Sequence, residues 1–489
     1  MNNSLPDRPF KAFKPLVVFA ILALSALPGL SASPRPMIYL TGVVACLVFC
    51  FIFLRRPIWG LYALILVSFF GRWEIGTGTK VSLNLTLLLA TGLLGLWILR
   101  MLVVDREVLL FPSRINAPAL LFVLGTTLSL IAGNIHWVLH AAGPARLHAQ
   151  LGAWGLYVLP MGILLLAGNQ VRDLACLRRL TWLFLGVGGL YLAARMIPAL
   201  AFVRLQWFVP TKHMGSMFWV WLVALSAGQC LFNHELHFRW RGCLALLGSA
   251  AIYAGFSHSQ SWISGWLPPL TAVSVMLCLH SPGSRLALLA ACSGWICLNF
   301  NYQFQAITAV FQDHSVVSRQ AAFPIMIALI KASPILGLGP ANYYHYTILY
   351  PILGWYVRFS SHNNYLDILA QTGLLGFAFF TWLIFELFRS AWRLRQRAKD
   401  GFTRGYSVAL MGGLAGMLVS GFMGDWFLPF VYNISTGGFR ASLFAWLFLG
   451  GLLALERMHA NTLTSALHSK AELTAAEHRP LGTTICGES

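Results

Sequence analysis

A histidine and two asparagines stand together in the segment SHNNYLDILAQTGLLG, residues 361–376. The imidazole of His362 titrates near neutral pH, so it can act as a general base or, when charged, as a ligand of phosphate oxygens. Asn363 and Asn364 can satisfy the free N–H groups at the start of a helix or bind sugar hydroxyls. The segment therefore predicts a polar, chemically active edge in front of the apolar run that follows it.

The same segment carries an aspartate and a pair of glycines. Asp367 lies five residues after His362, slightly off the same helical face, so we expect it near the site or in a capping role. Gly373 and Gly376 have a structural interpretation, because small residues let helices approach closely within membranes. We therefore assign the glycines to packing and His362 to chemistry.

The composition places these residues in a membrane. Of 489 residues, 58% are hydrophobic and only 10% charged, whereas soluble domains carry about 25% charged residues. Apolar runs long enough to cross about 30 Å of hydrocarbon recur along the whole chain. The sequence predicts an all-α, polytopic fold with about 12–14 transmembrane helices. The predicted spans are 15–31, 36–54, 57–71, 82–104, 117–135, 151–168, 180–198, 215–233, 242–257, 262–280, 285–300, 364–388, 405–424 and 440–456.

The spans divide the chain into five regions. We expect a cytoplasmic N-terminus over 1–14, an N-terminal bundle over 15–300, an outer loop with amphipathic helices over 301–363, C-terminal helices over 364–456, and a disordered cytoplasmic tail over 457–489. Both termini are predicted inside, because this orientation puts most Lys and Arg residues in the cytoplasmic segments. The net charge of +19 then reflects topology and anionic lipid headgroups rather than nucleic-acid binding.

Neither a metal site nor a cofactor is predicted. The nine cysteines form no CxxC pair, and the chain has no D-x-D or H-E-x-x-H motif. Positive side chains would then have to stabilise any departing phosphate group. The cations predicted on the outer face are Arg35, Arg72, Lys80, Arg146, Arg195, Arg204, Lys212, Arg319, Lys331, Arg358 and Arg440.

The outer loop supplies the best of these cations. After Arg319, apolar residues recur at helical spacing as far as Lys331, and SPILGLGP then ends the helix. Such a helix is typical of a segment lying along a membrane surface. Arginine binds phosphate oxygens through two parallel hydrogen bonds, so we predict Arg319 as a diphosphate ligand, with Arg204 and Lys212 as further candidates.

Two charged residues flank the last outer loop. Asp425 precedes it and Arg440 follows it, and we expect the two side chains to pair with each other.

These motifs resemble a known family. The pattern His-Asn-x9-Gly-x-x-Gly, formed by His362, Asn363, Gly373 and Gly376, is similar to that of the O-antigen ligase and polymerase family of bacterial envelope glycosyltransferases. The segments SRQAAFPIMIALIKASPILGLGPANYY (318–344) and TKHMGSMFWVWLVAL (211–225) resemble that family's loop and span entry. One place departs, because SHSQSWISGW (257–266) has His258 or Gln260 where an arginine is expected.

The resemblance implies a metal-independent, cofactor-free transfer on the periplasmic face of the bacterial inner membrane. A glycan would move from undecaprenyl diphosphate to an acceptor hydroxyl. The implied catalytic residue is His362, and the implied substrate-binding residues are Arg319, Arg204, Lys212, Asn363, His258 and Gln260. The acceptor would be lipid A–core in a ligase, which the complete histidine motif favours, or another lipid-linked glycan in a polymerase.

A transporter of lipid-linked oligosaccharides is the alternative of another class. Transporters usually contain internal repeats and ionisable groups near the bilayer midplane. Here no repeat is evident, and the polar groups gather near the predicted outer face.

Overall fold

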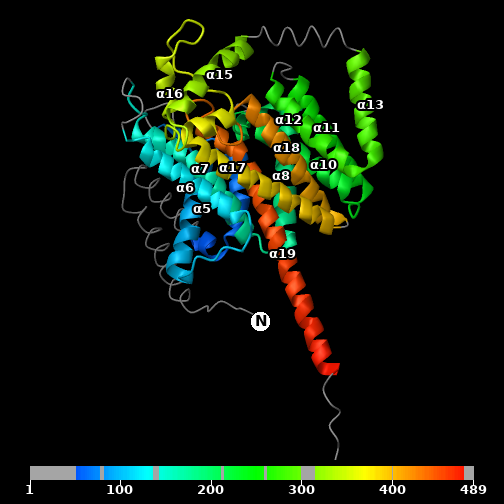
Figure 1. Cartoon of the computed structure of the whole chain (residues 1–489). Coiled ribbons are helices and arrows are strands. Elements are labelled where there is room, and N and C mark those ends of the chain that lie inside the picture. The colour runs from blue at the N-terminus through cyan, green and yellow to red at the C-terminus, as the bar shows by residue number, and fades with distance from the viewer. Residues whose placement is uncertain are drawn as a thin grey trace, which may run out of the picture.

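The computed structural model describes residues 51–76, 82–135, 142–210, 214–257, 262–298, 314–398 and 400–477. These residues form a bundle of helices with one small antiparallel hairpin (Figure 1). The α-helices are α4 (Ile58–Phe70), α5 (Leu85–Leu99), α6 (Asn116–Ala132), α7 (Leu147–Gln170), α8 (Leu174–Met196), α9 (Ala201–Trp207), α10 (Gly215–Phe232), α11 (Phe238–Ser257), α12 (Ile263–His280), α13 (Pro282–Leu298), α15 (His314–Ala332), α16 (Tyr343–Tyr346), α17 (Asn364–Arg397), α18 (Gly401–Met423) and α19 (Phe439–Glu477). The short elements are the π-helix η2 (Arg100–Asp105), the 3-10 helices η3 (Pro198–Leu200), η5 (Thr347–Leu349) and η6 (Thr436–Gly438), and the strands β1 (Glu74–Gly76) and β2 (Ser82–Asn84).

The helices confirm an all-α, polytopic membrane fold. Among the described residues, 7 helices are long and apolar enough to cross a membrane, or up to 8 if the pair α8 and η3–α9, bent by 113°, is one span. They are Leu85–Asp105, Leu147–Gln170, Gly215–Phe232, Ile263–His280, Asn364–Arg397, Gly401–Met423 and Thr436–Thr462. Four predicted spans coincide with helices that are not among these 7: the spans 57–71, 117–135, 242–257 and 285–300 correspond to α4, α6, α11 and α13. The spans 15–31 and 36–54 lie wholly or mostly outside the described residues, so the total of 12–14 stays a prediction.

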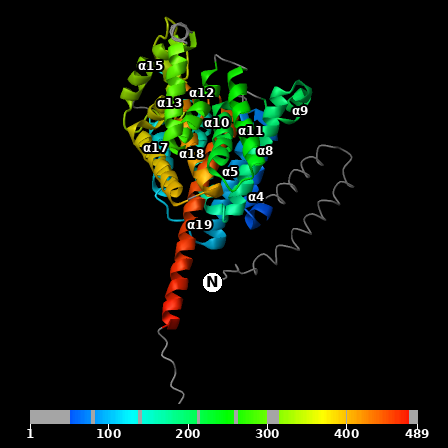
Figure 2. The same cartoon turned by 90° about the vertical axis from the view of Figure 1, so that its right-hand side faces the viewer.

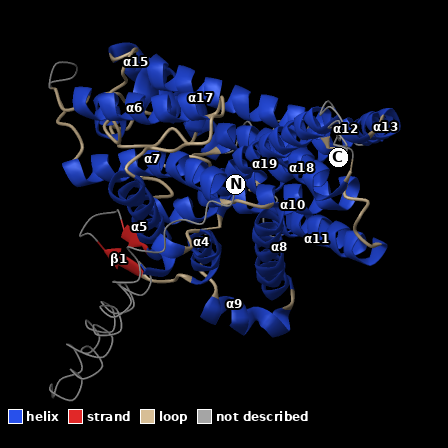
Figure 3. Ribbon diagram, turned by 90° about the horizontal axis from the view of Figure 1, so that it is seen from below, coloured by secondary structure: helices blue, strands red, loops and turns tan. Residues whose placement is uncertain are grey.

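The centre of the bundle is formed by α10, α18 and α19. Every residue of α19 in the 18-residue window that qualifies it as a span is buried, because this helix lies among α7, α10 and α18 (Figure 3). The side chains of Trp219, Trp221 and Trp446 are fully enclosed. Glycines of α10 and α18 face each other, since a Cβ on Gly228 would meet the backbone of Gly405 and Ala409. Small residues allow this close approach within a membrane, where van der Waals packing holds helices together.

Helix α17 is broken near its start. Gly373 has φ 65° and ψ −169°, a conformation open essentially only to glycine. The chain before α16 fills the break and pairs with the backbone groups that the break frees. These hydrogen bonds run from Leu338 N to Ala370 O (2.8 Å), Gly339 N to Gln371 O (3.1 Å), Leu374 N to Pro334 O (2.8 Å) and Leu375 N to Ile335 O (3.1 Å). The SPILGLGP segment therefore ends α15 and also completes α17.

A buried arginine ties α19 to the hairpin. Arg440 is fully buried, and its Nη1 donates to Glu74 Oε1 at 2.8 Å while its Nη2 donates to Gly71 O at 2.8 Å. The predicted pairing of Arg440 with Asp425 is therefore wrong. The hairpin brings Glu74 to the start of α19, although 366 positions separate the two residues in the chain.

Replacing Glu74 by alanine is expected to lower the free energy of unfolding by about 1.5–3 kcal/mol, as for a hydrogen bond to a charged group. The reason is that the buried guanidinium loses its only carboxylate among the described residues and keeps its bond to Gly71 O. Thermal unfolding of the purified protein in detergent measures the effect. Glu107→Ala, at an exposed glutamate with no side-chain bond among the described residues, is the matched control. Equal stability of the two variants would contradict the assignment.

The C-terminal part differs from its prediction. Residues 457–477 were expected to be disordered, but α19 continues through them to Glu477. The stretch contains five Ala and three Leu residues, which have high helix propensity, and it follows a helix that is already formed. Figure 2 shows this part of α19 leaving the bundle.

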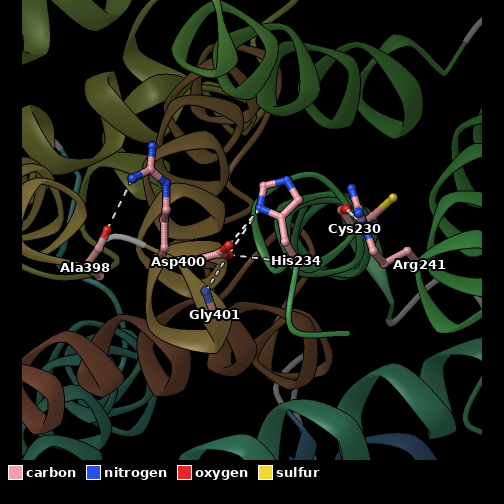
Figure 4. Close-up of polar contacts among 7 residues, drawn as sticks. Cys230, His234, Arg241, Ala398, Asp400 and Gly401 are labelled. Carbon is pink, nitrogen blue, oxygen red and sulfur yellow. Dashed lines mark hydrogen bonds and ion pairs between the residues drawn. The ribbon is translucent and has the colours of Figure 1, made fainter. Parts of the chain in front are cut away.

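A group of polar contacts joins the start of α18 to the turn between α10 and α11 (Figure 4). Asp400 accepts hydrogen bonds from the backbone N–H groups of His234 (3.0 Å) and Gly401 (2.6 Å), and its carboxylate lies 3.1 Å from His234 Nδ1. These backbone hydrogen bonds hold the pKa of Asp400 below its usual range. Asp400 therefore caps α18 and joins it to the α10–α11 turn.

Candidate functional site

His362 lies in a turn immediately before α17 and is half-buried. The next residue, Asn363, caps the helix, because its Oδ1 accepts from the backbone N–H groups of Tyr365 (2.9 Å) and Leu366 (3.2 Å). His362 itself has φ 50°, in the left-handed region that histidine enters more readily than most side chains. The turn points the imidazole away from the helix axis and toward the chain between α18 and α19.

That connecting segment, residues 424–435, supplies the partner of the imidazole. Asn433 Nδ2 lies 3.0 Å from His362 Nδ1 and also donates to Asp425 Oδ1 at 2.5 Å. The other carboxylate oxygen of Asp425 accepts from the backbone N–H of Phe430 at 2.8 Å. The buried Asp425 thus anchors Asn433, and Asn433 contacts His362.

Asn364 fastens the 424–435 segment to α17. Its side chain is buried, donates to Leu428 O at 2.7 Å and accepts from Phe427 N at 3.1 Å. Asn364 therefore sets the position of Asn433 and Asp425 relative to His362.

Asp367 stabilises the turn that contains His362 through hydrogen bonds. It is buried, and its Oδ1 accepts from Tyr343 Oη at 2.5 Å and from Ser361 Oγ at 2.6 Å. Ser361 Oγ in turn accepts from Asn363 N at 3.1 Å. Asp367 thus connects α16 to the residues on either side of His362 through hydrogen bonds. The cap of α17 is Asn363, not Asp367.

Three influences act on the charge of His362. Burial lowers the pKa of His362, the carboxylate of Asp425 raises it in part, and the positive charge of Arg319 lowers it again. Arg319 is exposed on α15, so its charge reaches the site from a different element. The net effect keeps the imidazole neutral at pH 7.

Aromatic rings and further cations surround the turn. Tyr344 stacks on Tyr432 with ring centroids 4.5 Å apart, and Tyr432 Oη lies 3.2 Å from His345 Nε2. Burial and the nearby Tyr344 raise the pKa of Tyr432, while the charges of Arg358 and Arg146 lower it. The charges of Arg358 and Arg146 therefore act on Tyr432, the neighbour in sequence of Asn433, while the charge of Arg319 acts on His362 itself.

A central segment of the chain, residues 243–381, matches the family model described as O-Antigen ligase. Over these residues, the chain is similar to the O-antigen ligase family. The matched segment runs from α11 into α17 and includes Arg319 and the His362–Gly376 motif. A search of curated proteins found no match to the chain.

The matched segment contains only part of the site geometry. Asp425 and Asn433 lie beyond its end. No sequence motif marks Asn433, and 71 positions separate it from His362, so the sequence could not indicate that the two side chains meet.

The structure separates one predicted ligand from the others. Arg204 is on α9, which the bend after α8 carries away from α15 and α17 (Figures 2 and 3). Its helix packs against α8 and η3. Arg204 therefore stays a predicted ligand, on a helix that lies apart from the helices of Arg319 and His362. Lys212, His258 and Gln260 lie outside the described residues.

The two motif glycines differ in their surroundings. Gly373 is the break in α17, where a Cβ would meet Ile335 O, so it contacts a loop rather than a neighbouring helix. Gly376 lies where α17 packs on α6, because a Cβ on Gly125 would be 3.8 Å from Gly376 Cα, but a Cβ on Gly376 itself would meet the Thr372 side chain. Within the described part of the chain, no group of three His, Cys, Asp or Glu residues is placed to hold a metal ion.

Proposed function

We propose that the chain transfers a glycan from undecaprenyl diphosphate to an acceptor hydroxyl, at a site around His362 on the periplasmic face of the bacterial inner membrane. The observation that carries the proposal is the half-buried His362 inside the family-matched segment, held by Asn433 and under the influence of the Arg319 charge. A neutral imidazole beside arginines suits a substrate that presents hydroxyls and phosphates together.

The reaction breaks the bond between the anomeric carbon of the glycan and an oxygen of the diphosphate. The acceptor oxygen forms the new bond to that carbon, and undecaprenyl diphosphate leaves with the bonding electron pair. The proton of the acceptor hydroxyl passes to the departing diphosphate, directly or through solvent water. Arg319, with Arg358 and Arg146 at the rim, supplies positive charge for the leaving group. Charge stabilisation of this kind is usually the largest contribution to catalysis. The chain's own arginines thus supply what a metal ion supplies elsewhere, and no cofactor is required.

The acceptor decides between ligase and polymerase, and we propose a ligase that uses lipid A–core. Purified protein given the lipid-linked donor and both acceptors would decide the matter. A product on lipid A–core identifies a ligase, and elongation of the lipid-linked glycan identifies a polymerase. Movement of the lipid across vesicles without a new glycosidic bond would identify the alternative, a transporter.

Replacing Arg319 by alanine is expected to lower transfer by about 10–100-fold, because a charge-assisted hydrogen bond contributes about 1.5–3 kcal/mol. The loss should appear mainly in kcat, because the negative charge on the leaving diphosphate develops in the transition state. Lys331→Ala is the matched control, since it removes an exposed cation near the other end of the same helix. Similar rates in the two variants would contradict a specific role for Arg319.

A further inference from the structure

The side-chain amide of Asn433 has a fixed orientation at the site. Its nitrogen donates to the Asp425 carboxylate at 2.5 Å, and Asp425 is held by the backbone N–H of Phe430. A carboxylate oxygen accepts hydrogen bonds, so it selects the NH₂ side of the amide and repels the carbonyl side. The second N–H of that NH₂ group is then directed at His362 Nδ1, 3.0 Å away.

An N–H pointing at Nδ1 determines which ring nitrogen carries the proton. In a neutral imidazole one nitrogen donates and the other accepts, and the partner of one nitrogen fixes the role of the other. Because Nδ1 accepts from Asn433, the proton resides on Nε2. A general base needs the opposite arrangement, with Nδ1–H held by an acceptor and a free lone pair on Nε2.

We propose that Asn433, anchored by Asp425, positions His362 as a neutral Nε2–H hydrogen-bond donor to an anionic oxygen of the glycan donor, and not as the base that deprotonates the acceptor. The assignment of the oxygen to a diphosphate rests on the proposed function, whereas the tautomer does not. Asn433 is a positioning residue, and His362 is the group that touches the substrate. The charged groups that act on the imidazole are Asp425 from the 424–435 segment and Arg319 from α15.

The tautomer can be measured without any activity. Full-length protein labelled with ¹⁵N-histidine, in detergent at pH 7.5, gives two-bond ¹H–¹⁵N correlations that distinguish Nδ1–H from Nε2–H rings. The His362 signals are identified by their loss in His362→Gln. An Nε2–H pattern is expected. An Nδ1–H pattern, or a protonated ring at this pH, would overturn the proposal.

A double variant reverses the direction of the hydrogen bond at His362 Nδ1 and keeps one carboxylate among residues 425 and 433. Asp425→Asn combined with Asn433→Asp exchanges the two side chains, so residue 425 can still accept from Phe430 N and donate to residue 433. The carboxylate then faces His362 Nδ1 and draws the ring proton to that nitrogen. We expect a wild-type melting temperature, an Nδ1–H pattern for His362, and transfer lowered at least tenfold. Unchanged or faster transfer with the reversed tautomer would show that Nε2 acts as a base.

A conservative variant provides the second activity readout. The amide of glutamine donates a hydrogen bond and cannot take up the acceptor proton. His362→Gln should therefore retain at least tenfold more transfer than His362→Ala. Equal loss in both would refute the donor role. If wild-type protein forms no glycosidic bond at all, the proposed function fails, while the NMR result still decides the tautomer.

Discussion

Replacing His362 by alanine is expected to lower glycan transfer by about 10²–10³-fold, the usual effect of removing one preorganised donor at a developing negative charge. The loss should appear in kcat, because a bond that strengthens as the diphosphate leaves contributes mainly to the transition state. The measurement is the steady-state rate of glycosidic-bond formation by purified protein. Neither alanine nor histidine is β-branched, so the left-handed backbone at this position is retained.

The pH profile provides a check on the same prediction. Burial lowers the pKa of His362 below its ordinary value of about 6.5, so the ring is neutral at pH 7. Protonation at lower pH would place an Nδ1–H against the Asn433 amide nitrogen. We therefore expect kcat/KM to be flat near pH 7 and to fall on the acid side, at a pH below 6.5. An alanine variant with wild-type kcat, or one that keeps this acid limb, would contradict the role of His362.

Replacing Gly373 by alanine is expected to destabilise the protein strongly. The backbone conformation of Gly373 costs another residue about 1–3 kcal/mol. In addition, the new Cβ would overlap Ile335 O and the backbone of Gly337, and overpacking a tight site costs about 1–3 kcal/mol. The expected result is a large fall in melting temperature in detergent, or too little folded protein to purify.

Gly92→Ala is the control for Gly373→Ala. Gly92 lies within α5, and a Cβ there would meet nothing within 4 Å. Alanine has the higher helix propensity by about 1 kcal/mol, so this variant should be as stable as the wild type or slightly more stable. If Gly373→Ala and Gly92→Ala unfold at the same temperature, the break in α17 is not required for stability.

Sequence reasoning succeeded where the cause is local. Apolar runs predicted the membrane fold because a helix in lipid satisfies its own backbone within a single segment. The capping capacity of Asn363 follows in the same way from its position before an apolar helix, and its Oδ1 does accept from the first turn of α17.

The remaining features depend on contacts between distant segments. The sequence suggested that Gly373 packs against a neighbouring helix. Its conformation is instead set by the 333–339 loop, whose N–H and C=O groups form the hydrogen bonds that the backbone of an unbroken α17 would form with itself. Arg440 looked like the partner of the nearby Asp425, whereas the hairpin brings Glu74 to it. Asn433 had no motif at all, because its role arises only when the 424–435 segment folds back on α17.

The division of the site between two segments has a consequence for protein engineering. The family-matched residues 243–381 contain His362 but end before the side chains that set its protonation. A chimera that received only residues 243–381 would contain His362 but would lack Asn433 and Asp425, which set the tautomer of its imidazole. Transfer of a working site into a relative therefore requires the 424–435 segment to be moved together with Asn364, which binds it to α17.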